Sequence, residues 1–225
     1  SGLAEVLLGD SVCNQLWPQR ENSLNIAHLA SNQAITPAGT YMLLKTYLEH
    51  NPQTQDVFYI VIPQTLGNDL NLNFTYQYFV LPFVNHDSIK LLDYDTVQKL
   101  YNKFGKIFIT NKYVKTLLQN TNLFMKKYRD HLNTKTEELY TQRISPTAAI
   151  YLAKIRDLCT ERKINLHILP MALADVAKNH DWKDFMQDVK DYGFEDIMGG
   201  FADSIKYYPE DWMFDGIHFK PEILD

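Results

Sequence analysis

Apolar residues in this chain fall into short continuous runs, separated by longer stretches in which they recur every three or four positions. Four of the short runs predict buried strands, at residues 4–8, 23–29, 57–62 and 164–170. The third is the strongest, because it consists of β-branched and aromatic residues and stops at Pro63. The last strand, or a remnant of it, is expected within residues 194–205.

The segments between these runs carry helix signals. Thr36-Pro37 places an N-cap residue before a proline at the first helical position, which predicts a helix that ends by Asn51. Ser145-Pro146 has the same form, and one apolar helical face follows it, made of Ala149, Leu152, Ile155 and Leu158. Further helices are expected at residues 93–101, 114–131 and 182–192, whereas residues 106–110 fit either a strand or a short connector.

Strands that alternate with helices of about 10 to 15 residues indicate βαβ units and a mainly parallel sheet. We therefore expect an α/β fold, a three-layer α/β/α sandwich, in one domain over residues 1–225. A long insertion is expected after the third strand, at about residues 70–143. In such sheets function resides at the carboxyl ends of the strands, so polar residues that directly follow a strand are candidates for chemistry.

The composition is that of an ordinary globular protein, since 45% of the 225 residues are hydrophobic and 22% are charged. The formal net charge of −5 argues against an electrostatic grip on nucleic acid or anionic lipid. No run of about 18 apolar residues is present, so no membrane span is expected. Cys13 and Cys159 have no metal-ligand spacing, and we expect two buried free thiols.

Two short segments at opposite ends of the chain carry candidate catalytic groups. Ser11 lies in a turn directly after the first predicted strand, at the functional edge of the sheet. Asp215 precedes His218 by three residues, a spacing that lets the carboxylate turn back onto the imidazole Nδ1–H. Nε2 is then free to take a proton from a serine. In the simpler interpretations, Ser11 only caps a helix, and Asp215 and His218 form a surface pair or half of a metal site.

In this order, the two segments resemble the SGNH, or GDSL-type, hydrolases. Leu8-Gly9-Asp10-Ser11 is similar to the first sequence block of that family, and Asp215-Gly216-Ile217-His218 to its last, the DxxH block. The resemblance covers most of the chain outside residues 70–143. It implies that Ser11 is the nucleophile, that His218 is the general base and then acid, and that Asp215 fixes the tautomer of His218. It also implies catalysis without a metal or organic cofactor.

The same resemblance implies an oxyanion hole, formed by the Ser11 backbone N–H and by donors from a second and a third block. The second block falls near residues 30–34 and holds no glycine, which leaves Asn32 or Gln33 as the backbone donor. The third block matches Leu66-Gly67-Asn68-Asp69 with one residue missing. Asn68 is therefore the candidate side-chain donor, with Gln64 as the alternative and a simple turn role for Asn68 as the competing interpretation.

The resemblance implies acyl-ester chemistry, and the loose second and third blocks are closest to its cell-envelope members. We expect an O-acyl ester, above all an O-acetyl ester, on a bacterial glycan, with a small-molecule or glycan partner. One alternative is a polysaccharide O-acetyltransferase that uses the same three residues. The others are a non-catalytic glycan-binding module and a metal-dependent phosphodiesterase based on Asp10, Asp215 and His218. The oligomeric state stays open.

The sequence leaves two alternatives open for the role of one aromatic segment and two for the cellular compartment. The aromatic segment at residues 74–79 is either a core-facing connection or an aromatic wall suited to stacking on sugar rings. Ser1-Gly2 has the form of a remnant left by tag removal, and an N-terminal anchor removed with it would place the protein in the cell envelope. Without such an anchor the expected compartment is the cytoplasm.

Overall fold

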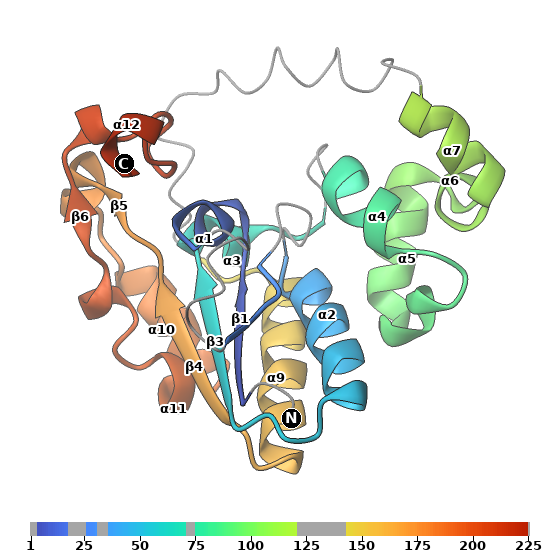
Figure 1. The fold of residues 1–225 in the computed structure, drawn as a ribbon, viewed down its shortest axis with the longest axis horizontal. Coiled ribbons are helices and arrows are strands. Elements are labelled where there is room, and N and C mark those ends of the chain that lie inside the picture. The colour runs from blue at the N-terminus through green and yellow to red at the C-terminus, as the bar shows by residue number, and fades with distance from the viewer. Residues whose placement is uncertain (1–3, 18–25, 31–35, 71–74, 121–142, 225) are drawn as a thin grey trace.

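The computed structural model describes residues 4–17, 26–30, 36–70, 75–120 and 143–224 (Figure 1). The chain has an α/β fold whose described part contains a central sheet of four parallel strands in the order β2-β1-β3-β4. The strands are β1 (Glu5–Gly9), β2 (Ile26–His28), β3 (Asp56–Val61) and β4 (Asn165–Pro170). These confirm the four strands expected from the sequence; residues 23–25 of the second lie outside the described residues.

The helices lie between and after these strands (Figure 1). In chain order they are α1 (Ser11–Leu16), α2 (Pro37–His50), α3 (Pro63–Gly67), α4 (Leu81–Phe83), α5 (Tyr94–Phe104), α6 (Lys106–Thr110), α7 (Lys112–Asn120), α9 (Pro146–Glu161), α10 (Lys183–Asp191), α11 (Glu195–Met198) and α12 (Pro221–Leu224). A second, two-stranded sheet pairs β5 (Leu173–Ala174) with β6 (Tyr207–Tyr208).

The register of the central sheet brings the carboxyl ends of its strands to one edge. Glu5 at the start of β1 is paired with Ile26 on one side and Asp56 on the other, and Asp56 is paired with Asn165. The chain moves from β1 to β2 on one side and later to β3 on the other. The end of β1 is therefore a topological switch point, where open α/β sheets form binding crevices.

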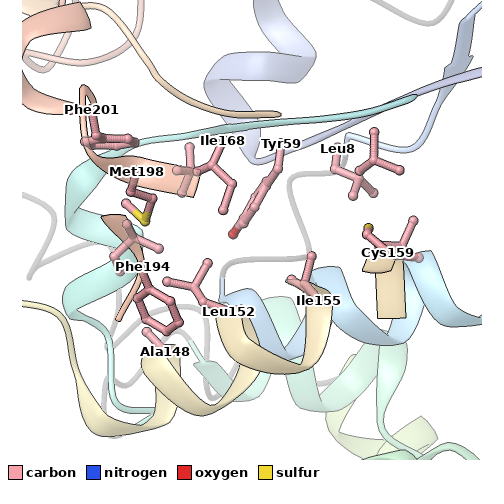
Figure 2. Packing of buried hydrophobic residues seen from close by; sticks show 14 of the residues in the cluster. Leu8, Tyr59, Ala148, Leu152, Ile155, Cys159, Ile168, Phe194, Met198 and Phe201 are labelled. Carbon is pink, nitrogen blue, oxygen red and sulfur yellow. The ribbon is translucent and has the colours of Figure 1, made fainter. Parts of the chain in front are cut away.

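One face of the sheet packs on α2 and α9. Alternate strand residues, including Leu8, Tyr59 and Ile168, form a buried cluster with Leu152 and Ile155 of α9 (Figure 2). Figure 2 also shows Phe194, Met198 and Phe201 at one end of this cluster. Their burial extends the layer from α9 to the segment around α11.

The opposite face packs on α1 and the C-terminal part of the chain. Leu7 and Ile60 lie in a second buried cluster with Val12 and Cys13 of α1 and with Ile217. Helical layers therefore cover both faces, as in a three-layer α/β/α sandwich. The N-cap predictions are also confirmed: the hydroxyl of Thr36 accepts from Gly39 N–H at 3.5 Å, and that of Ser145 accepts from Ala148 N–H at 3.0 Å.

The segment after β3 forms a small helical unit against α2 and α9. A π-helical stretch (Tyr76–Val80) precedes α4, a 3-10 turn (Ser88–Leu91) follows, and α5, α6 and α7 complete the described part. Tyr76 and Phe79 are buried together with Met42 of α2 and Tyr151 of α9. These two rings of the aromatic segment are core residues; Phe74 lies outside the described residues.

Two sequence interpretations require correction. Residues 106–110, expected as a strand or a short connector, form the short helix α6, and Ile107 and Phe108 are exposed where a buried strand would hide at least one of them. Residues 194–205 contain α11 and a 3-10 turn (Ala202–Ser204) rather than a strand. Phe194, Met198 and Phe201 are buried there at intervals of four and three, which is helical spacing.

The remaining helix predictions agree with the structure over the part that it describes. Residues 93–101 lie in or directly before α5, and 182–192 enclose α10. The helix expected at 114–131 begins at Lys112 as α7, and residues 121–131 lie outside the described part. Among the described residues, no helix has both the length and the hydrophobicity that a membrane span requires.

Candidate active site

Ser11 occupies the first position of α1, directly beyond the carboxyl end of β1. Asp10 is the N-cap residue of that helix, and its Oδ1 accepts the backbone N–H of Val12 at 3.1 Å. Because Asp10 takes the capping role, the Ser11 hydroxyl is not needed as a cap. Ser11 is half-buried, so its side chain combines a fixed position with access to solvent.

Gly9 is required because the start of α1 packs tightly on β3. A Cβ at this position would lie 2.8 Å from the carbonyl oxygen of Ile60 and even closer to the side chain of Cys13. Close backbone approach therefore explains the glycine, and its φ does not lie in the left-handed region. The absence of a side chain lets Ser11 lie close to the sheet edge.

Asp215 and His218 form a tight turn that orients the imidazole. Oδ1 of Asp215 accepts the backbone N–H groups of Ile217 at 3.2 Å and His218 at 2.9 Å. Oδ2 lies 2.8 Å from His218 Nδ1. Gly216, with φ of 85°, adopts the left-handed conformation that this turn requires. The three-residue spacing thus folds the carboxylate back onto the ring.

The structure brings Ser11 and His218 together across 207 positions of the chain. Ser11 Oγ lies 2.8 Å from His218 Nε2. With Nδ1–H donating to Asp215, Nε2 accepts a hydrogen bond from the Ser11 hydroxyl. The result is a continuous Ser–His–Asp hydrogen-bond chain, the arrangement by which a serine becomes a nucleophile.

A fourth side chain, which the sequence analysis did not single out, joins the two segments. Gln15 Nε2 donates to the carbonyl oxygen of Phe219 at 2.7 Å, and Phe219 N–H donates to Gln15 Oε1 at 3.0 Å. Gln15 lies one helical turn after Ser11, so both side chains leave the same face of α1. The four-residue spacing from Ser11 is the only sequence signal that points to Gln15, and it is weak because many helical residues have such a spacing from a neighbour.

Asp10 fastens the start of α1 to the start of α3. Its Oδ2 accepts the Thr65 hydroxyl at 3.0 Å and the Ile62 N–H at 3.5 Å. Burial raises the pKa of this carboxyl, and the hydrogen bonds from Thr65, Val12 and Ile62 offset only part of that effect. Asp10 therefore serves as a buried connection between the two turns that border Ser11.

The charges of the pair support a base at His218. Burial lowers the pKa of His218, but its hydrogen bond to Asp215, the negative charge of Asp215 and that of Asp10 together raise it above its ordinary value. Partial burial raises the pKa of Asp215, and the hydrogen bonds and positive charge of His218 outweigh this and lower it. With 41% of its side chain exposed, Asp215 stays ionised at neutral pH.

The side-chain candidates for the oxyanion hole differ in their contacts. Asn68 is buried, its Oδ1 accepts Leu70 N–H at 2.9 Å, and its carbonyl oxygen accepts the Ser145 hydroxyl at 3.0 Å. These are the contacts of a turn residue, and they support Leu70 in the left-handed conformation, with φ of 64°. Asn32 and Gln33 lie outside the described residues.

Gln64 is half-buried in the first turn of α3, directly after β3. It lies between Ile62 and Thr65, which both bind Asp10, the residue before Ser11. The described structure gives its side-chain amide no hydrogen bond. Gln64 is thus held at the Ser11 edge of the sheet with a free donor.

Among the residues that the structure describes, Cys13 and His167 lie outside this hydrogen-bond chain. Burial raises the pKa of the Cys13 thiol to about 12, which keeps it protonated and unreactive. His167 binds Asp56 at the amino ends of the strands, away from Ser11. Within the ranges that the structure describes, no three His, Cys, Asp or Glu side chains are grouped so that they could hold a metal ion.

Comparison of the chain with protein-family models, curated proteins and solved structures finds no match. The relation to the SGNH hydrolases therefore remains a resemblance carried by the two motifs. The geometry of Ser11, His218 and Asp215 stands independently of it.

Proposed function

We propose that the protein is a serine esterase that acts on an O-acyl ester, above all an O-acetyl ester on a carbohydrate. The observation that carries this proposal is the unbroken hydrogen-bond chain from Ser11 Oγ through His218 to Asp215, with both links at 2.8 Å. If Asp215 and His218 were only a surface ion pair, Nε2 of His218 would have no reason to contact a serine. If Ser11 were only a helix cap, its Oγ would have no reason to contact an imidazole. The Ser11–His218–Asp215 hydrogen-bond chain explains both contacts.

In the first half of the reaction, His218 Nε2 removes the Ser11 proton while Oγ forms a bond to the ester carbonyl carbon. The carbonyl π pair moves onto oxygen and gives a tetrahedral oxyanion. Its collapse breaks the bond to the alcohol oxygen, and His218 Nε2–H protonates this leaving group. Asp215 stabilises the imidazolium that forms in between.

In the second half, His218 takes a proton from water, whose oxygen attacks the acyl carbon bound to Ser11. Collapse of the second intermediate releases the acid and returns the proton to Ser11 Oγ. A sugar hydroxyl in place of water would make the same acyl-enzyme a transferase. Which acceptor arrives second thus decides between the two activities.

The oxyanion needs donors that are already in place. The backbone N–H of Ser11 is one, and as the side-chain donor we favour the half-buried amide of Gln64 over that of Asn68, which is buried and whose Oδ1 is held by Leu70 N–H. Such a donor contributes about 3 to 4 kcal/mol to the stability of the transition state. Its loss should therefore appear in kcat rather than in KM.

The proposal is tested by release of p-nitrophenol from p-nitrophenyl acetate, measured in chelator for the wild type and for Ser11→Ala. We expect turnover in the wild type and a loss of roughly 10⁴- to 10⁶-fold in the variant. A loss of only a few-fold would remove Ser11 as the nucleophile. Oligosaccharide acceptors added to the same assay separate transfer from hydrolysis.

A further inference from the structure

Three large aromatic side chains are exposed in the segment that leads into the Asp215–His218 turn. Tyr208 is 36% exposed, Trp212 39% and Phe214 80%. Tyr208 lies in β6, Trp212 in the 3-10 turn Glu210–Trp212, and Phe214 at the start of the bend that follows Met213. Three exposed rings within seven residues form an apolar surface of a kind that marks binding sites.

Backbone pairing fixes this segment against the catalytic turn. Phe214 N–H donates to the carbonyl oxygen of His218 at 2.7 Å, and Lys220 N–H donates to that of Trp212 at 2.9 Å. Met213 and Phe219 face each other between these pairs, and both are buried. The exposed Phe214 is thus directly bonded to the residue whose ring contacts Ser11.

The rings themselves form a connected series. Tyr208 packs edge-on against Phe219 with ring centres 5.4 Å apart, and it stacks on Trp212 at 5.9 Å with planes 26° apart. Phe219 is buried and follows His218 in sequence. The series therefore extends from the core beside the catalytic histidine out to the exposed face of Trp212.

We propose that Tyr208, Trp212 and Phe214 form a subsite that binds a sugar ring of the ester substrate, an inference that rests on the proposed esterase function. The apolar C–H face of a pyranose ring packs on exposed aromatic rings, while its hydroxyl groups need acceptors. The exposed carboxylates of Glu210 and Asp211, in the same segment, supply them.

The same two carboxylates argue against a hydrocarbon chain as the occupant. An acyl tail laid over this segment would remove water from Glu210 and Asp211 without offering a hydrogen bond, which is costly for charged groups. Sugar hydroxyls would replace that water. The surface therefore favours the carbohydrate part of the substrate, and the acyl group is left to the Ser11 side.

The chain offers matched controls elsewhere. Tyr94 and Tyr113 are 74% and 83% exposed, in the helical unit after β3. We compare Trp212→Ala and Phe214→Ala with Tyr113→Ala, using partially O-acetylated xylo-oligosaccharides and p-nitrophenyl acetate as substrates. The ratio of kcat/KM for the oligosaccharide to that for the small ester should fall roughly 3- to 10-fold for each subsite variant and stay constant for Tyr113→Ala.

Binding is measured separately from turnover, by titration calorimetry of Ser11→Ala with the same oligosaccharides. A heat of binding that is present in Ser11→Ala and lost in the double variants that also carry Trp212→Ala or Phe214→Ala supports the subsite, even where the wild type hydrolyses no ester. No binding by Ser11→Ala overturns it, as does equal weakening by Tyr113→Ala. Turnover of p-nitrophenyl acetate with an unchanged specificity ratio also overturns the subsite, while it leaves the esterase proposal intact.

Discussion

The side-chain amide of Gln15 forms hydrogen bonds with both the N–H and the carbonyl group of Phe219. Its neighbour one helical turn earlier, Ser11, contacts His218, the residue before Phe219. Two adjacent residues of the C-terminal segment are thus attached to two positions on one face of α1. The Gln15 link fixes the segment through its backbone and leaves the His218 ring to the serine.

Gln15→Leu should lower kcat about 10- to 100-fold with little change in KM, because the turn that carries His218 loses its second attachment to α1. The two lost hydrogen bonds should also reduce the free energy of unfolding by about 1 to 3 kcal/mol. Gln187→Leu removes an exposed glutamine whose amide bonds exposed Asp191, far from Ser11 in the sequence, and it should change neither quantity. The rate of Ser11 labelling by a fluorophosphonate reports positioning directly; a wild-type rate in Gln15→Leu would rule out that role.

The pH dependence of activity should reflect the raised pKa of His218. A general base must be neutral, so kcat/KM should fall as the pH drops through a value above the ordinary histidine pKa of about 6.5. Asp215→Asn removes the negative charge that stabilises the imidazolium, which should lower the pKa of His218 in an NMR titration of its ring protons. A pKa that does not decrease in this variant would contradict the assigned contact.

Asp10 should affect stability in a pH-dependent way. Its pKa is raised in the folded protein, so ionisation of the buried carboxyl costs stability as the pH rises above the unfolded value of about 3.9. Denaturant unfolding of Asp10→Asn and the wild type, compared over this range, should shift in favour of the variant with rising pH. Asp10→Ala leaves the donors at Val12 and Thr65 unpaired and should cost about 1 to 3 kcal/mol at pH values below the unfolded pKa, and this cost should shrink as the pH rises. A difference in unfolding free energy between Asp10→Asn and the wild type that is independent of pH would refute the raised pKa of Asp10.

Gly9→Ala should destabilise the protein by about 1 to 3 kcal/mol, because the added methyl group meets the backbone at Ile60 and cannot move away. Gly200 provides the control, since a Cβ there would meet nothing within 4 Å. Gly200→Ala should be neutral or slightly stabilising in thermal unfolding. Equal effects of the two substitutions would contradict the close approach of Gly9 to the backbone at Ile60.

Gln64→Ala should lower kcat by about 10²- to 10³-fold with KM and the unfolding midpoint unchanged, as expected for loss of an oxyanion donor. Asn68→Ala should instead lower the unfolding midpoint, since Asn68 supports the left-handed Leu70. Steady-state kinetics and thermal unfolding of the two variants separate these roles. Exchange of the two phenotypes would return the donor role to Asn68.

The sequence was sufficient to predict the four strands of the central sheet and the long helices, because their signals are local; the two-residue strands β5 and β6 were not predicted. The run of β-branched and aromatic residues at 57–62 and the caps at Thr36 and Ser145 depend only on neighbouring residues. Residues 194–205 were misassigned: the buried residues Phe194, Met198 and Phe201 have helical spacing, but α11 is only four residues long and offers a weak periodic signal. Ser11, Asp215 and His218 could be named from motifs, and the structure brings them together.

Gln15 and Asp10 could not be assigned their contacts from the sequence. The Gln15–Phe219 contact spans 204 positions and depends on where the C-terminal segment crosses α1. Asp10 binds Ile62 and Thr65 because two turns meet at the edge of the sheet. Such contacts follow from the packing of distant elements, which no local pattern encodes.

The central claim is that Ser11 carries the acyl group, and the most direct measurement is rapid acid quench of the enzyme during turnover of p-nitrophenyl acetate. Peptide mass spectrometry then locates the acetyl group. We predict an acetyl ester on Ser11 in the wild type, and none on that peptide in Ser11→Ala or His218→Ala. Turnover with the acetyl group on another residue, or with no acetylated Ser11 under any quench time, would contradict the Ser11–His218–Asp215 mechanism.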